Sequence, residues 1–234
     1  FTLDASLIPD FGQVAFDNVE LNLGPFEQQF SENRAFFTEG ATLFEIADGD
    51  MGGGSFFYSR RIGEKVSVGN DLLTNDEQIY DFDNTPQLLS TVKVTGTTSK
   101  NLSIGFLNAI TDKVDAEIQN SSSNQRRKQT IQPLVNYNVI SLSQQLLNDY
   151  SSISVLNTNK TGSDGLYGNN MAFVGDLFDD NRDFNIKMKV FGSKTPKKNS
   201  DNGFRAGINL SELKGNFRYN VSWWGVDKHY NQNE

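Results

Sequence analysis

Segments in which apolar and polar residues alternate constrain the fold of this chain more than any other feature. The clearest one covers residues 184–190, FNIKMKV, where every second residue is apolar. Residues 204–210 and 216–223 repeat this scheme. Because successive side chains of a β-strand point to opposite faces, a period of two predicts strands with one apolar face.

Six further segments alternate less regularly. They are residues 1–7, 91–97, 102–110, 134–143, 151–157 and 170–178. Between the strands we predict short turns at residues 98–101, 145–149, 179–183 and 212–215, and long loops at residues 111–133, 158–169 and 193–203. If each strand pairs with its successor, all short turns lie at one end of the sheet, as in outer-membrane barrels.

Composition agrees with strands that cross a membrane. The chain has 234 residues, of which only 36% are hydrophobic, and no apolar stretch is long enough for a membrane-spanning helix. A tilted strand crosses the bilayer with about 9–11 residues, and only alternate ones must be apolar. We therefore predict an all-β fold, an antiparallel transmembrane β-barrel of outer-membrane type that is only partly contained in this chain. A soluble β-sandwich adhesin is the alternative, because its strands alternate too.

Several classes of site are excluded or disfavoured. A net charge of −8 argues against nucleic acid, and the absence of cysteine excludes thiolate metal sites. His229 is the only histidine, so histidine triads are excluded. The glycine-rich residues 48–54 lack the ligand spacing of a calcium or phosphate loop, and the basic residues 125–128 fit a solvated loop. We expect no catalytic residue, metal or cofactor. An envelope enzyme with its active site on outer loops is the competing hypothesis.

Residues 10–88 differ from the rest, since they are rich in Phe, Gly, Asp and Glu without sustained periodicity. We predict three parts: a barrel strand at residues 1–9, a lumen or loop insert at 10–88, and a hairpin array at 89–234. Charged residues of the insert are expected to form an ion-pair cluster that ties it to the barrel wall, with Phe36 and Phe37 as anchors. The cluster residues are Glu32, Arg34, Glu39, Arg60 and Arg61. A ligand site at the two last arginines is the alternative.

Polar side chains of the alternating segments are expected to face the barrel lumen, because charges avoid hydrocarbon. The lumen-facing candidates are Lys93, Lys187, Lys189, Arg205, Asn209, Arg218 and Asn220. Their cations either attract anionic solutes or pair with acidic residues of the insert. Tyr150, Trp223 and Trp224 are expected near strand ends, in aromatic girdles at the membrane interfaces.

Three motifs carry a resemblance to a known family: PDFGQV at residues 9–14, FEQQFSENRAFFTEG at 26–40 and FFYSRRIG at 56–63. With these motifs in this order, the chain resembles a Bacteroidota outer-membrane β-barrel family of unknown function. Its members often carry an N-terminal family-nine-like carbohydrate-binding module. Ala35 stands where the family usually has proline, and Ala15 with Phe16 replaces an acidic and a small residue.

The resemblance implies that residues 1–8 form an internal barrel strand, that a binding module precedes this piece and that strands follow Glu234. It implies no reaction. We expect a non-enzymatic protein of the bacterial outer membrane that acts as a channel, receptor or platform in glycan capture or solute uptake. The expected partners are outer-membrane lipid, the barrel-insertion machinery, and a glycan or a small anionic solute.

Overall fold

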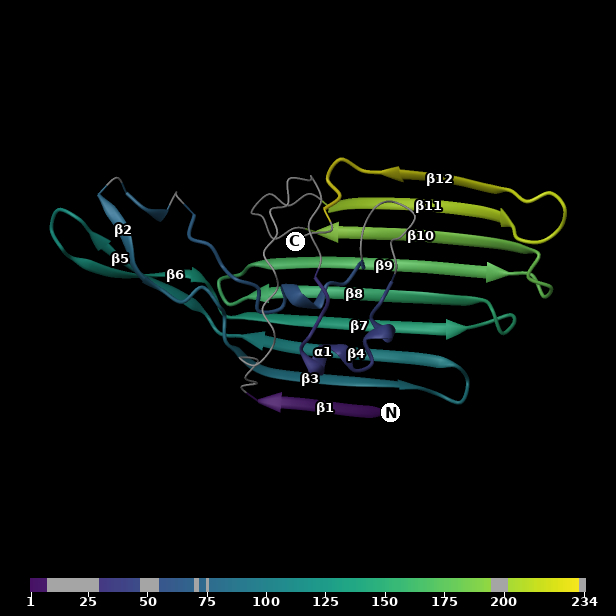
Figure 1. Cartoon of the computed structure of the whole chain (residues 1–234), viewed down its shortest axis with the longest axis horizontal. Helices are drawn as coiled ribbons and strands as arrows, with labels where there is room; N and C mark the ends of the chain where they lie inside the picture. The colour runs from purple at the N-terminus through teal and green to yellow at the C-terminus, as the bar shows by residue number, and fades with distance from the viewer. Residues whose placement is uncertain (8–29, 47–54, 70–71, 75, 195–201, 232–234) are drawn as a thin grey trace.

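The main element of the protein is an open antiparallel sheet of nine strands, here called the long sheet (Figure 1). The computed structural model describes residues 1–7, 30–46, 55–69, 72–74, 76–194 and 202–231. In spatial order the strands are β1 (Thr2–Leu7), β3 (Leu88–Thr97), β4 (Leu102–Thr111), β7 (Val135–Gln145), β8 (Ser152–Gly162), β9 (Tyr167–Phe178), β10 (Phe184–Lys194), β11 (Asn202–Glu212) and β12 (Asn220–Val226). The predicted all-β antiparallel fold is confirmed. The sheet is not closed into a barrel, since β1 and β12 lie at opposite edges.

All nine alternating segments contribute a strand to the long sheet, with two corrections to their bounds. The long loop expected at residues 158–169 is wrong, because β8 and β9 continue their ladder and leave only residues 163–166 as the connection. The ends of these strands consist mainly of Asn, Thr and Gly, so no alternation of apolar residues marks them as strand. Strand β12 starts at Asn220, so the expected start at residue 216 is also wrong. Phe217 and Tyr219 alternate like strand residues but lie in the preceding turn.

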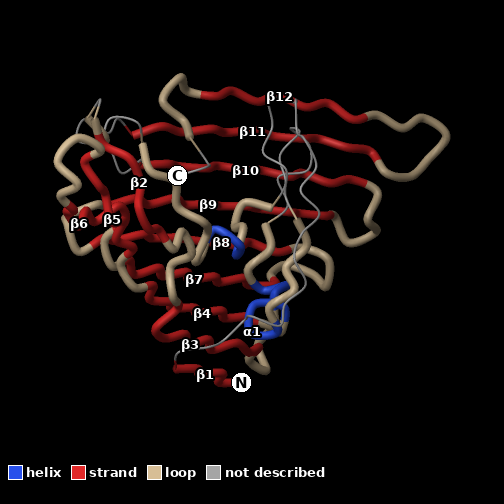
Figure 2. Tube along the Cα trace, turned by 60° about the vertical axis from the view of Figure 1, so that its left-hand side comes forward, coloured by secondary structure: helices blue, strands red, loops and turns tan. Residues whose placement is uncertain are grey.

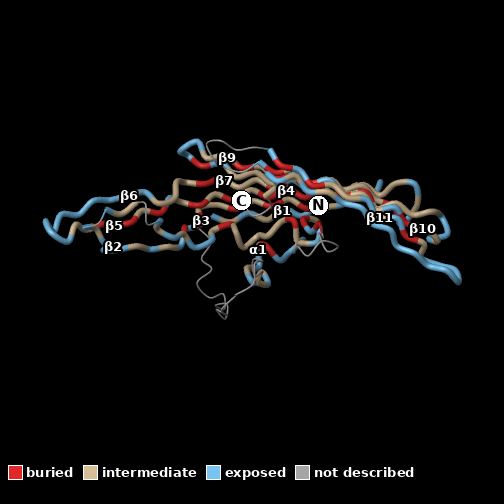
Figure 3. The backbone as a smooth tube through the Cα atoms, turned by 90° about the horizontal axis from the view of Figure 1, so that it is seen from above, coloured by how far each residue is buried: buried red, intermediate tan, exposed pale blue. Residues whose placement is uncertain are grey.

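A second antiparallel sheet, here called the small sheet, takes two strands from the loop predicted at residues 111–133 and one from the insert predicted at 10–88. Its central strand β5 (Val114–Asn120) pairs with β2 (Glu77–Phe82) and β6 (Arg126–Gln132). The basic run expected in a loop therefore begins β6, where Arg127 Nε donates a hydrogen bond to Glu77 Oε1 at 2.8 Å. The small sheet projects from one end of the long sheet and does not lie over its face (Figure 2 and Figure 3).

The two faces of the long sheet differ in chemistry. Along β10, Ile186 and Met188 point to one face, while Lys187 and Lys189 point to the other. The ladder register carries this difference across the sheet, since Met188 lies opposite Ile208 of β11. We call the first face the outer face. The second is the insert face, because residues 30–46 and 55–64, here called the insert, pack against it (Figure 3).

The hydrophobic core lies between the insert and the insert face. The insert contributes Phe37, Phe44, Ile46, Phe56 and Ile62, and the sheet contributes Leu88, Leu107, Ala109, Val139, Leu156, Ala172 and Phe191. A Cβ at Gly105 would lie 2.9 Å from the Phe44 ring, so this glycine permits close contact. The insert contains α1 (Ala35–Thr38) and the 3-10 turns η1 (Ala41–Leu43) and η2 (Ser59–Arg61). None of the helices in the described ranges is long and apolar enough to cross a membrane.

Candidate functional site

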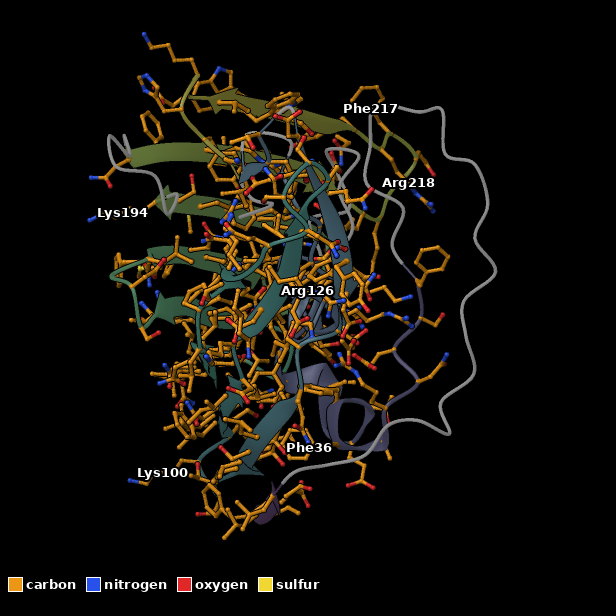
Figure 4. The ribbon with its side chains drawn as sticks, turned by 90° about the vertical axis from the view of Figure 1, so that its left-hand side faces the viewer. Phe36, Lys100, Arg126, Lys194, Phe217 and Arg218 are labelled. Carbon is orange, nitrogen blue, oxygen red and sulfur yellow. The ribbon has the colours of Figure 1, made fainter. Side chains whose placement is uncertain are left out.

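Lys93 of β3 anchors the insert to the long sheet. Its side chain is 1% exposed, and Nζ donates hydrogen bonds to the backbone oxygens of Phe36 and, at 2.8 Å, of Glu39. Asp4 Oδ2 of neighbouring β1 lies 3.3 Å from Nζ, and the Phe36 ring centroid lies 4.8 Å away. Figure 4 labels Phe36, which is part of α1. A buried ammonium group is costly unless it is paired and hydrogen-bonded, and these groups satisfy Lys93.

Glu32, Arg34 and Ser59 join the two halves of the insert. Arg34 Nε and Nη2 donate to the two carboxylate oxygens of Glu32 at 2.9 and 2.7 Å, and Ser59 Oγ donates to Glu32 Oε2 at 2.6 Å. Arg34 also donates to the backbone oxygen of Ile62 at 2.8 Å and lies 4.2 Å from the Phe37 ring centroid. Burial alone would raise the pKa of Glu32, but hydrogen bonds from Arg34 and Ser59 outweigh it and lower that pKa. These contacts fix the insert as a folded unit.

Other contacts place the remaining residues of the predicted cluster. Arg60 Nη1 donates to the backbone oxygen of Ser31 at 2.7 Å. Arg61 lies 5.7 Å from the Tyr58 ring centroid. Glu39 contributes its backbone oxygen to Lys93. Glu32 and Arg34 of the predicted cluster thus form an ion pair within the insert. Arg60 binds the insert backbone, and Glu39 contacts β3 through its own backbone oxygen.

Six of the seven predicted lumen-facing residues share the insert face. They are Lys93, Lys187, Lys189, Arg205, Asn209 and Asn220. Lys187 Nζ lies 3.3 Å from Asp176 Oδ2 of β9, so this cation pairs within the sheet instead of with an acid of the insert. The Arg205 guanidinium lies 5.1 Å from the Phe191 ring centroid. Arg218 is the exception, because it lies in the turn before β12 (Figure 4).

A cavity of about 110 Å³ lies between part of the insert and strands β7, β8 and β9. Tyr58, Arg61 and Glu64 line it from the insert, and Tyr137 and Lys160 line it from the sheet. Each cation stands near an aromatic ring: Arg61 is 5.7 Å from the Tyr58 centroid, and Lys160 is 5.9 Å from the Tyr137 centroid. Two cations, a carboxylate and two tyrosine rings therefore meet around one space.

Sequence reasoning missed Tyr137 and Lys160 as site residues. Lys160 falls in the segment predicted as a long loop, because residues 157–162 are polar on both faces of β8 and show no apolar alternation. Tyr137 lies near the start of β7 and faces the insert. Only the pairing of β7 with β8 places it opposite Lys160.

The two tryptophans do not lie at a strand end, where an aromatic girdle was predicted. Trp223 is opposite Ile208 on the outer face, and Trp224 is opposite Gly207 on the insert face. Both occupy the middle of β12 instead of its end. Tyr150, in contrast, lies in the short turn between β7 and β8, as expected.

Some predicted features fall outside the described residues, namely the motif at residues 9–14, the start of the motif at 26–40 and the glycine-rich residues 48–54. Within the described ranges, no group of three or more His, Asp or Glu side chains could hold a metal ion. The family model described as "Domain of unknown function (DUF5916)" matches residues 1–234. No curated protein and no solved structure matches the chain.

Proposed function

We propose that this chain, which belongs to the DUF5916 family, forms wall strands and a lumenal insert of an outer-membrane β-barrel that captures or admits small solutes. The observation that supports this most is the outer face of the long sheet, which presents many exposed large apolar side chains. They include Leu3, Ile140, Leu142, Met171, Ile186, Val190, Phe204, Ile208, Leu210, Val221 and Trp223.

Water is a poor solvent for such a face. Exposed apolar surface costs roughly 25 cal/mol per Å², and monomeric soluble proteins rarely expose contiguous apolar patches larger than a few hundred Å². In a soluble β-sandwich a second sheet would cover this face. Among the described residues, the small sheet extends from the end of the long sheet and leaves the outer face open. Hydrocarbon is the environment that suits this face.

The opposite face fits a barrel lumen. It carries Lys93, Lys187, Lys189 and Arg205, and the insert packs on it through a hydrophobic core that insert and sheet share. Among the described strands, β1 and β12 each have a neighbour on one side only. Their outer backbone groups need partner strands, because an open sheet edge does not persist in a lipid bilayer. Further strands at these two edges would complete the barrel.

The two tryptophans give a direct test, because they are neighbours on opposite faces of β12 and the chain has no others. Variants Trp224→Phe and Trp223→Phe each keep one indole. In vesicles of bromine-labelled phosphatidylcholine, bromine quenches the fluorescence of an indole that touches the acyl chains. We expect the emission of Trp223 to be quenched several-fold more than that of Trp224.

Matched vesicles without bromine supply the control for each variant. Equal quenching of the two indoles, or stronger quenching of Trp224, would contradict a lipid-facing outer face. Failure of the chain to enter vesicles at all would contradict the membrane location.

A further inference from the structure

We propose that a row of polar side chains on the outer face, here called the polar row, binds the phospholipid headgroups of the bilayer. The inference rests on the proposed function and adds the level at which the wall strands leave the hydrocarbon. The row crosses six neighbouring strands in ladder register. Its residues are Asn108 of β4, Asn138 of β7, Asn159 of β8, Asn169 of β9, Lys194 of β10 and Asn202 of β11.

An apolar row runs beside the polar row on the same face. Four residues nearer the short turns, the same six strands present only apolar side chains, namely Ile104, Leu142, Val155, Phe173, Val190 and Ala206. Strand β10 has 11 residues from Phe184 to Lys194. A tilted strand needs about 9–11 residues to cross the hydrocarbon layer. The apolar part of β10 and the position of the polar row thus agree with one crossing.

The asparagines of the polar row make hydrogen bonds along the outer face. Asn108 Nδ2 donates to Asn138 Oδ1 at 2.8 Å, and Asn169 Nδ2 donates to Asn157 Oδ1 at 3.3 Å. Each amide has two N–H donors and an acceptor oxygen, so such contacts leave capacity for a further partner. Hydrocarbon supplies none, and a polar group without a partner there costs several kcal/mol. Phosphate and ester oxygens of headgroups accept such N–H groups.

Lys194 and Tyr167 add the side chains that are typical of a membrane interface. Lys194 Nζ lies 5.2 Å from the Tyr167 ring centroid, and Tyr167 is exposed. Lys194 points away from the insert (Figure 4). Tyrosine is enriched at headgroup level, and a lysine near a strand end extends its ammonium group to the headgroups. The ammonium group suits the phosphate of a lipid.

The small sheet sets an independent limit on the hydrocarbon. Strand β4 ends at Thr111, and Lys113 Nζ lies 2.9 Å from Asp115 Oδ2 soon after it. Charged side chains are costly in hydrocarbon, so the chain has left it before Lys113. Asn108 lies at the same end of β4, which agrees with this limit. The small sheet projects beyond this end and therefore lies in water (Figure 3).

Depth-dependent quenching tests the polar row. In a background with Trp223→Phe and Trp224→Phe, the substitutions Ile104→Trp and Asn108→Trp each place one indole on the outer face of β4. Four residues of a strand span about 13 Å, which at a tilt of about 40° separates the two positions by about 10 Å in depth. The vesicles contain phosphatidylcholine that is brominated either near the headgroup or near the end of the acyl chains.

Bromine near the chain ends should quench the indole of Ile104→Trp several-fold more than that of Asn108→Trp. Bromine near the headgroup should reverse this order. Equal depths of the two indoles, or a deeper indole in Asn108→Trp, would overturn the inference.

A second pair of variants guards against misfolding of the first. Leu142→Trp and Asn138→Trp repeat the comparison on β7, because Leu142 is the ladder partner of Ile104 and Asn138 that of Asn108. Gln78→Trp places an indole on an exposed position of the small sheet. Iodide in the water should quench it, and bromine on the acyl chains should not. Quenching of Gln78→Trp by chain bromine would count against the inference.

The same data separate this inference from the proposed function. An indole of Ile104→Trp that chain bromine quenches to the same extent as that of Asn108→Trp would reject the polar row and leave the membrane wall standing. Absence of quenching in both Ile104→Trp and Leu142→Trp would reject the wall, and the polar row with it.

Discussion

Replacing Lys93 by methionine should release the insert from the long sheet. Methionine keeps the length and apolar stem of lysine but removes the ammonium group that binds the oxygens of Phe36 and Glu39. Hydrogen bonds to charged groups contribute about 1.5–3 kcal/mol each, and an acceptor left buried without a partner costs about 1–3 kcal/mol.

Two effects reduce this sum. The variant avoids the desolvation penalty of a buried charge, which is several kcal/mol. Asp4 keeps some contact with solvent after the ammonium group is removed, because its side chain is 26% exposed. Removing one partner of a buried pair typically costs about 3–5 kcal/mol. We therefore expect the free energy of insert docking to fall by about 3 kcal/mol, which corresponds to about a 100-fold increase in the undocked fraction.

Hydrogen exchange followed by mass spectrometry would measure this change locally. Peptides that cover α1 should lose protection by about 100-fold, while peptides from β8 and β9 should keep theirs. Lys187→Met is the matched control, since it removes a cation from the same face that pairs with Asp176 of the sheet. Unchanged exchange in α1, or an equal loss in the control, would refute the assignment of Lys93 as the anchor.

Two further predictions concern other contacts. Gly105→Ala places a Cβ about 2.9 Å from the Phe44 ring, so it should lower the free energy of unfolding by about 1–3 kcal/mol in thermal or denaturant unfolding. Gly192→Ala is the control and should have little effect, because its Cβ meets no atom within 4 Å. Equal effects of the two substitutions would contradict the close approach of Gly105 and Phe44. Hydrogen bonds from Arg127 and from the Thr74 backbone lower the pKa of Glu77 to about 2, so the contribution of this carboxylate to the small sheet is complete above about pH 4.5 and fades as the pH falls toward 2. Exchange of β2 amides against pH should show this loss, and Arg127→Gln should shift it to higher pH; no shift would count against the pair.

The strands of the long sheet could be predicted because alternation is local information. In β10, each apolar residue marks the outer face regardless of what pairs with it. Strand ends are different, since they depend on how far the neighbour runs. Phe217 and Tyr219 alternate like strand residues, yet β11 ends at Glu212 and leaves only part of this segment with a ladder partner.

The small sheet and the insert were harder to anticipate. Val114, Ala116 and Ile118 do alternate within the predicted loop, a signal that the loop prediction did not use. In the insert, Phe44 and Phe56 are buried by contacts with strands far away in the sequence. No periodicity reveals such contacts. For the same reason, the residues of the cavity could be named only after β7 and β8 were paired.

The position of the insert between two neighbouring strands has a consequence for assembly. Residues 8–87 separate β1 from β3, whereas only residues 98–101 separate β3 from β4. Closing a loop of about 80 residues costs about 2.7 kcal/mol more chain entropy than closing one of about four. We therefore expect the hairpins from β3 onward to form first.

The contacts of Lys93 offset part of this cost in chain entropy. It is the ladder partner of Asp4 in β1 and also binds the end of α1, so docking the insert draws the two ends of the long connection together. Each event raises the local concentration of the other's partner. Addition of β1 to the sheet edge and docking of the insert should thus occur as one cooperative step, the last to form and the first to open.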